Sequence, residues 1–241
     1  MLNLGLGDGP LTPMLLLYHQ ARSSKAEYRT MVPRLKEMGY NCLAVDLSSG
    51  AECREVKNQT AKLATHGGRE PSYLDAMPDI LDSVIWARAN HAQGKLLVWG
   101  SSYSASLALE AAAEHPDVID GVLAFSPGEY FAALGKSATW IREEAAKVEC
   151  PVFVTAARSE ESDWKPIFEA IPSKVKTTFV PAGPGTHGAR ALWPESAGNE
   201  EYWTAVEAFL KANFPAPPPP KGAADEPEEK DPRQEPKQDG G

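Results

Sequence analysis

The chain of 241 residues lacks three features that would otherwise direct its interpretation: paired cysteines, long apolar runs and clustered positive charge. Its three cysteines, Cys42, Cys53 and Cys150, are an odd number without metal-site spacing, and we expect Cys42 and Cys150 to be buried thiols. No apolar run is long enough to span a membrane. The formal net charge is −9 and no lysine or arginine stripe is present, so nucleic acid is not an expected partner.

Both ends of the chain differ from its middle. The first eight residues, MLNLGLGD, have neither the basic start nor the apolar stretch of an export signal, so the sequence as written predicts a cytoplasmic protein unless a precursor was trimmed. From Pro215 the chain is rich in proline and charged residues, with no aliphatic residue larger than alanine. Such a segment buries too little apolar surface to order itself. We therefore predict one domain over residues 1–214 and a disordered tail over residues 215–241.

Short apolar runs alternate with segments of helical periodicity throughout the middle of the chain. We expect strands at 14–18, 41–45, 95–99, 119–124, 152–156 and 176–180. We expect helices at 26–38, 73–90, 103–114, 137–147, 165–170 and 200–213. This alternation predicts an α/β fold, a mostly parallel sheet with helices on both faces, whose first strand is 14–18. Right-handed crossovers then gather the functional loops at the carboxyl ends of the strands.

One strand end carries a candidate nucleophile. The segment LLVWGSSYSAS, residues 96–106, runs from an apolar strand into a small-residue helix, with Ser102 at the corner. A serine on such a tight turn needs small residues two positions away on either side, and Gly100 and Ser104 meet that need. Ser101 would place Trp99 and Tyr103 at those positions, and Ser104 itself lies a turn into the helix. The pattern therefore favours Ser102.

A serine nucleophile needs a base, and histidine has a suitable pKa. Of the five histidines, His187 lies in a flexible loop, PGTHG, between the last strand and the last helix, and we take it as the base. His91 and His115 end helices, where the helix dipole already accounts for an imidazole. His66, in a glycine-rich loop, and His19, at the end of the first strand, are alternatives.

The imidazole in turn needs a carboxylate that orients it. The loop after strand 152–156 holds three acids, Glu160, Glu161 and Asp163. Glu160 is favoured because the acid usually follows the small residue at the strand end by about three positions. Glu161 and Asp163 stay open as alternatives, as solvated loop charges or as the acid, and Asp46 after the second strand is a weaker candidate.

The oxyanion of a tetrahedral intermediate needs backbone donors. The amide of Tyr103, at the positive end of a helix, is one candidate. The loop after the first strand should give the second, and we favour Ala21, with Gln20 next.

These residues resemble the α/β-hydrolase superfamily: a GSSYS elbow around Ser102, an acid near Glu160 and then His187, in that chain order. The likeness covers nearly all of residues 14–214. Only a short stretch, 126–147, stands where large cap domains are inserted, so the chain is most similar to the compact dienelactone-hydrolase and small-esterase branch. The resemblance implies an open pocket. Four aromatic residues are candidates for its wall or, equally, for the core: Phe125, Tyr130, Phe131 and Trp140.

The chain also departs from the family pattern. Ser104 replaces the second elbow glycine, Gln20 follows His19 where glycine is common, and no aspartate occupies the usual acid position. Little precedes Met14, so we expect the antiparallel N-terminal hairpin of larger members to be missing.

Two functions follow from the site. The first is a serine hydrolase that cleaves small-molecule carboxylic esters through an acyl-enzyme, with thioesters or dienelactone-type substrates as variants and no cofactor or metal. The second is a non-catalytic module of the same fold whose proline-rich tail binds a partner. The oligomeric state does not follow from the sequence.

Overall fold

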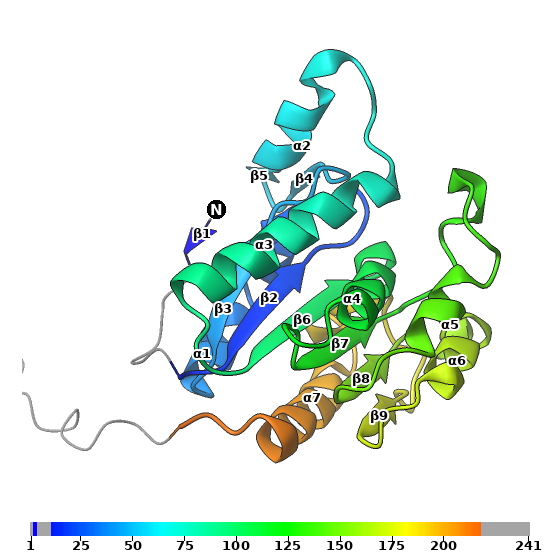
Figure 1. The fold of residues 1–241 in the computed structure, drawn as a ribbon. Helices are drawn as coiled ribbons and strands as arrows, with labels where there is room; N and C mark the ends of the chain where they lie inside the picture. The colour runs from blue at the N-terminus through cyan, green and yellow to red at the C-terminus, as the bar shows by residue number, and fades with distance from the viewer. Residues whose placement is uncertain (1, 4–10, 218–241) are drawn as a thin grey trace, which may run out of the picture.

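A seven-stranded sheet lies at the centre of the computed structural model, which describes residues 2–3 and 11–217 (Figure 1). Its order is β1-β3-β2-β6-β7-β8-β9, and every neighbouring pair is parallel except β1 with β3. The strands are β1 (Leu2–Asn3), β2 (Met14–Tyr18), β3 (Asn41–Val45), β6 (Leu96–Ser101), β7 (Gly121–Phe125), β8 (Val152–Thr155) and β9 (Lys176–Phe179). The predicted mostly parallel sheet is confirmed.

Helices cover both faces of this sheet (Figure 1). The α-helices are α1 (Val32–Glu37), α2 (Gln59–Ala64), α3 (Met77–Asn90), α4 (Tyr103–Glu114), α5 (Trp140–Ala145), α6 (Glu161–Ala170) and α7 (Asn199–Asn213). Helices α3 to α6 pack on one face and α1 with α7 on the other. Because strand side chains alternate between faces, Leu16 and Val98 enter the first core, whereas Leu17 and Trp99 enter the second.

The first strand differs from the expectation. Leu2–Asn3 pairs antiparallel with β3, Leu2 opposite Ala44, so the prediction that residues 14–18 form the first strand is wrong. A two-residue edge strand is too short to carry an apolar pattern, and it depends on the neighbour with which it pairs.

The polar segment between β3 and α3 holds structure that the apolar pattern did not predict. Strands β4 (Glu52–Cys53) and β5 (Val56–Lys57) form a hairpin, and Arg54 and Glu55 turn it with positive φ angles of 48° and 64°. Asn58 then caps α2, its Oδ1 accepting from the amide of Ala61 at 2.8 Å. Helix α2 projects from the body of the molecule at the top of Figure 1.

Two further observations concern the ends of the chain and the membrane. The predicted tail over 215–241 falls, from residue 218, outside the described residues. Within the described ranges, no helix combines the length and apolar character needed to cross a bilayer.

Candidate active site

Ser102 lies alone between the end of β6 and the start of α4. Its backbone has φ 61° and ψ −127°, a strained conformation for a residue with a side chain. The Ser102 amide donates to the Phe125 carbonyl of β7 at 2.7 Å, which fixes the turn to the sheet. A Cβ on Gly100 would lie 2.3 Å from the Ser104 carbonyl oxygen, so this crossing of strand and helix requires glycine.

The two neighbouring serines use their hydroxyls in the protein interior. Ser101 Oγ accepts from the Ala189 amide at 2.8 Å, and Ser104 Oγ donates to the Tyr18 carbonyl at 2.8 Å. Both are fully buried, whereas Ser102 is 8% exposed. Of these three serines, Ser102 is therefore the one that can be reached from solvent.

Glu160 and His187 meet at the carboxyl edge of the sheet. Glu160 ends the short helix η5 (Arg158–Glu160) after β8, and its Oε1 hydrogen-bonds His187 Nδ1. Burial alone would raise the pKa of Glu160, but the hydrogen bonds from His187 and Ser126 outweigh it and hold the pKa below its usual value. Glu160 is thus an ionised partner for the imidazole.

The other candidate acids are engaged elsewhere or lie apart. Glu161 pairs with Lys165 at 2.7 Å on the exposed face of α6. Asp46 forms a buried salt bridge with Lys25 at 2.9 Å. Asp163 is exposed on α6 and lines the cavity described below. Of the acids considered from the sequence, Glu160 is the one in contact with His187.

The loop that carries His187 is anchored to the turn that carries Ser102. The residue after the histidine, Gly188, donates its amide to Ser126 Oγ at 2.9 Å, and the next amide, that of Ala189, donates to Ser101 Oγ. A Cβ on Gly188 would lie 2.5 Å from Ser101 Oγ, and its φ is +68°, so glycine is required here. The structure therefore brings the loops of Ser102, Glu160 and His187 together.

The alternative histidine of the first strand is held in place on both ring nitrogens. His19 Nδ1 donates to the Gln20 carbonyl at 2.8 Å, and Nε2 accepts from the Leu47 amide at 2.9 Å. Burial lowers the pKa of His19 to about 4. His19 is a neutral buried residue that fixes the loop after β2, and His66 is exposed in η2 (Thr65–Gly67).

The three candidate oxyanion donors are the amides of Gln20, Ala21 and Tyr103, and one of them already donates to a protein acceptor. The Gln20 amide donates to Glu27 Oε2 at 3.0 Å. Within residues 11–217, no protein acceptor takes the amide proton of Ala21. The Tyr103 amide stands at the first position of α4, where the helix dipole is positive. Ala21 and Tyr103 therefore have amides available for a ligand.

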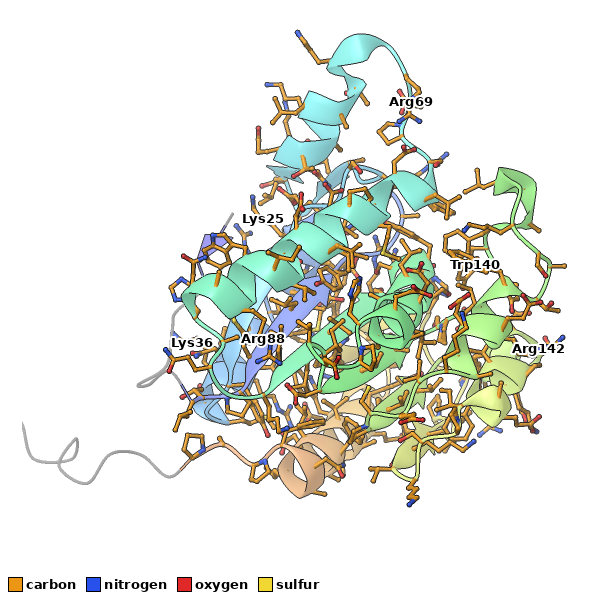
Figure 2. The ribbon with its side chains drawn as sticks, viewed as in Figure 1. Lys25, Lys36, Arg69, Arg88, Trp140 and Arg142 are labelled. Atoms are coloured by element: carbon orange, nitrogen blue, oxygen red, sulfur yellow. The ribbon has the colours of Figure 1, made fainter. Side chains whose placement is uncertain are left out.

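A cavity of about 420 Å³ lies between the segment after β7 and helices α5 and α6; Ser102, Glu160 and His187 are not among the residues that line it. Its lining includes Tyr130, Arg142, Asp163 and Ile167. Figure 2 shows Arg142 on α5. The Tyr130 hydroxyl donates to the Ser126 carbonyl at 2.8 Å, which connects the cavity wall to the strand end beside Ser102.

Of the four aromatic residues that the sequence indicated as pocket wall or core, one lines the cavity and three lie in the core. Tyr130 lines the cavity. Phe131 and Trp140 pack edge to face at 4.9 Å, and Phe125 stacks on Trp99 at 5.1 Å in the opposite core. These three are at most 8% exposed and belong to the core.

Two polar residues at the site were missed from the sequence. Ser126 follows β7, and its hydroxyl donates to Glu160 Oε2 at 2.7 Å; a serine directly after an apolar strand was the available signal. Glu27 is fully buried beneath Gln20, and burial raises its pKa. No sequence pattern distinguishes it from a solvated helix charge. In residues 11–217, no cluster of three or more His, Cys, Asp or Glu side chains is arranged to hold a metal ion.

The fold is that of the α/β-hydrolases, and solved structures with a similar arrangement of strands and helices include lipolytic enzymes and a dienelactone hydrolase. One is a structure reported for LipS and LipT, two metagenome-derived lipolytic enzymes (TM-score 0.65, 14% identity, covering 86% of this chain and 96% of that one). Another is the dienelactone hydrolase of Anabaena variabilis (0.63, 15%, 84% and 87%). A third is the monoacylglycerol lipase of Paleococcus ferrophilus (0.59, 17%, 84% and 96%).

The sequence itself identifies the family. Residues 45–212, more than half of the chain, match the family described as "Putative esterase", and the chain belongs to this esterase family. No curated protein sequence matches the chain. The resemblance to compact α/β-hydrolases is confirmed, and family membership supports ester hydrolysis as the activity.

Proposed function

We propose that this protein is a serine hydrolase that cleaves small carboxylic esters through an acyl-enzyme on Ser102. One observation carries the proposal: the Glu160–His187 hydrogen bond is formed by a loop that is tied to the Ser102 turn through Ala189. A strained, accessible serine beside an imidazole that is oriented by a carboxylate is the arrangement that activates a hydroxyl.

In the first half-reaction, Ser102 Oγ attacks the ester carbonyl carbon while His187 Nε2 takes the hydroxyl proton. Glu160 holds Nδ1 and stabilises the imidazolium that results. The carbonyl oxygen becomes an oxyanion that accepts hydrogen bonds from the Ala21 and Tyr103 amides. When the carbonyl re-forms, the C–O bond to the alcohol breaks, and His187 returns its proton to the leaving oxygen.

In the second half-reaction, water replaces the alcohol. His187 takes a proton from the water as it attacks the acyl carbon. The bond from that carbon to Ser102 Oγ then breaks, His187 returns the proton to Ser102 Oγ, and the carboxylic acid leaves. Each proton is passed by His187 between Ser102 and the leaving alcohol, or between water and Ser102, so the only protein groups that these steps need are those named above.

The cavity beside Tyr130 favours an ester of modest size. Its volume of about 420 Å³ suits one acyl or alcohol group rather than a polymer. Asp163 on its wall and the net charge of −9 disfavour polyanionic substrates. Rates for p-nitrophenyl esters of increasing acyl length measure this preference, and we expect short chains to react fastest.

Labelling with a fluorophosphonate probe separates this proposal from a non-catalytic binding module. We expect one phosphonyl group per folded chain, and none in Ser102→Ala. His187→Ala should fold, as judged by circular dichroism, and lose both labelling and p-nitrophenyl acetate hydrolysis. A folded wild-type protein that neither reacts with the probe nor hydrolyses any ester of the panel would overturn the proposal and favour the binding module.

A further inference from the structure

Ser126 is held in a fixed position at the carboxyl end of β7. Its φ is +54°, its amide donates to the Thr155 carbonyl of β8 at 2.7 Å, and the residue is 1% exposed. A positive φ is costly for a residue with a Cβ, so it persists only where the surroundings determine it. Serine thus occupies a backbone position that glycine would adopt with less strain, so the side chain of Ser126 is what the position gains.

The Ser126 hydroxyl joins two of the loops that form the site. Its oxygen lies 2.7 Å from Glu160 Oε2 and 2.9 Å from the Gly188 amide nitrogen. An ionised carboxylate can only accept and an amide can only donate, so the hydroxyl proton goes to Glu160 and a lone pair receives Gly188. One oxygen atom therefore connects the acid to the residue that follows His187.

This connection decides which way the glutamate points. Glu160 Oε2 accepts from the Ser126 hydroxyl and also from the Ala157 amide at 2.9 Å, which leaves Oε1 for His187. Glutamate has one more rotatable bond than aspartate, so more conformational freedom must be removed to orient its carboxylate. Two donors on one oxygen remove that freedom.

We propose that Ser126 is a positioning residue for the hydrolase reaction: its hydroxyl fixes Glu160 and the His187 loop relative to each other. This inference rests on the proposed serine hydrolase function. Ser126 does not touch the reacting atoms, so it acts on the rate of the chemical step through Glu160. The affinity for the ester, set by the cavity, should change little.

Ser126→Gly is the sharpest test because glycine accepts the positive φ and removes only the side chain. We expect kcat for p-nitrophenyl acetate and the rate of phosphonylation of Ser102 to fall about 100-fold, as misplaced catalytic groups do. KM should stay within about threefold, and labelling should still reach one group per chain. Ser126→Ala, which keeps the Cβ, should show the same loss if the glycine variant folds poorly.

Ser173→Ala is the matched control. Ser173 is also a buried serine whose hydroxyl bonds to the backbone, at Val175, but it precedes β9 at the far edge of the sheet. This variant should keep wild-type kcat. A loss of kcat as large as in Ser126→Gly would show that removal of any buried hydroxyl has this effect, and would overturn the inference.

A double-mutant cycle with Glu160→Gln tests the route of the effect. If Ser126 acts through Glu160, then Ser126→Gly should cost at most about twofold in the Glu160→Gln background. If Ser126→Gly lowers kcat in the Glu160→Gln background as much as it does in the wild type, the inference is overturned. It is also overturned if the Ser126→Gly single variant has wild-type kcat. The same holds if that variant is phosphonylated at the wild-type rate but in a smaller fraction of chains. If the wild-type protein is not labelled at Ser102, it is the proposed function that fails.

Discussion

Two adjacent strands of this sheet, β6 and β7, are each followed by a serine with a positive φ angle. Ser102 follows β6 and Ser126 follows β7, with positive φ angles of 61° and 54°. Each amide donates at 2.7 Å to a carbonyl at the end of the next strand, Phe125 for the first and Thr155 for the second. Both turns present a serine hydroxyl at the carboxyl edge of the sheet.

The surroundings of the two hydroxyls differ. That of Ser102 lies in a partly open position before α4, whereas that of Ser126 is buried and bonded on both sides, to Glu160 and Gly188. The turn places each serine hydroxyl at the edge of the sheet, and the neighbouring loops determine which groups that hydroxyl contacts. The Ser102 hydroxyl, which is the more accessible, suits attack in the proposed reaction, and the Ser126 hydroxyl, whose donor and acceptor sites are occupied, suits orientation of other groups.

The largest expected effect comes from removing the accessible hydroxyl. Ser102→Ala should reduce kcat/KM for p-nitrophenyl acetate by at least about 10⁴-fold, because no nucleophile remains. The melting temperature should change little, since alanine keeps the bond from the residue 102 amide to the Phe125 carbonyl. Residual hydrolysis above about 1% of wild type would place the nucleophile on another residue.

The next largest effect is expected from neutralising Glu160, the carboxylate that accepts a hydrogen bond from Ser126. Glu160→Gln should lower kcat by about 10³- to 10⁴-fold, because the neutral amide no longer stabilises the imidazolium of His187. Glu161→Gln is the matched control, since Glu161 pairs with Lys165 on the exposed face of α6, and it should stay within about twofold. A large loss in Asp163→Asn instead would reassign the acid.

The two turns also differ in how far they could be predicted. The Ser102 turn is local, because its strand, its small residues and the start of its helix lie within eleven consecutive positions. The Ser126 contacts join loops after β7, β8 and β9, and no spacing in the sequence encodes the meeting of three loops. Glu160 was favoured by its distance from a strand end, but only the folded chain shows that Glu161 points elsewhere.

The same reasoning explains the errors in the fold. The apolar strands were predicted well, because burial on both faces leaves a continuous apolar run. The hairpin of β4 and β5 and helix α2 are polar and exposed, and their signals are a turn and an asparagine cap. Strand β1 depends on pairing with β3, which is not a local property.

Substitution by glycine should change the free energy of unfolding in opposite directions at Ser102 and at Ser126. Ser102→Gly relieves a strained φ and keeps the backbone bond to the Phe125 carbonyl, so we expect a gain of about 1 kcal/mol in the free energy of unfolding. Ser126→Gly relieves similar strain but leaves the buried Gly188 amide without its acceptor, so we expect a net loss of about 1 kcal/mol. Urea denaturation at pH 7 measures both. Equal changes in the two variants would contradict the distinction.

The smallest expected effect is a dependence on pH. The pKa of Glu160 is lowered in the fold, so its contribution to stability is present above the unfolded pKa and is lost as the pH falls through the folded pKa. Without the Ser126 hydroxyl, which favours the ionised form, the folded pKa rises and this contribution shrinks. The stability gap between wild type and Ser126→Gly should therefore narrow by about 0.5 kcal/mol from pH 6 to pH 3.5.

Ser102→Gly is the control for this titration. Its stability difference from wild type should stay constant over the same pH range, because no hydrogen bond to Glu160 changes. A gap that narrows equally in both variants would assign the pH dependence to the fold as a whole.

The most direct test of the account is to trap the acyl-enzyme. Wild-type protein mixed with p-nitrophenyl acetate, quenched in acid within the first turnover and digested, should yield an acetylated peptide whose modified residue is Ser102 by mass spectrometry. The acetyl group should disappear at later times as water releases it, and Ser102→Ala should yield none. Ester hydrolysis without an acyl group on Ser102, or with a stable acyl group on another residue, would contradict the account.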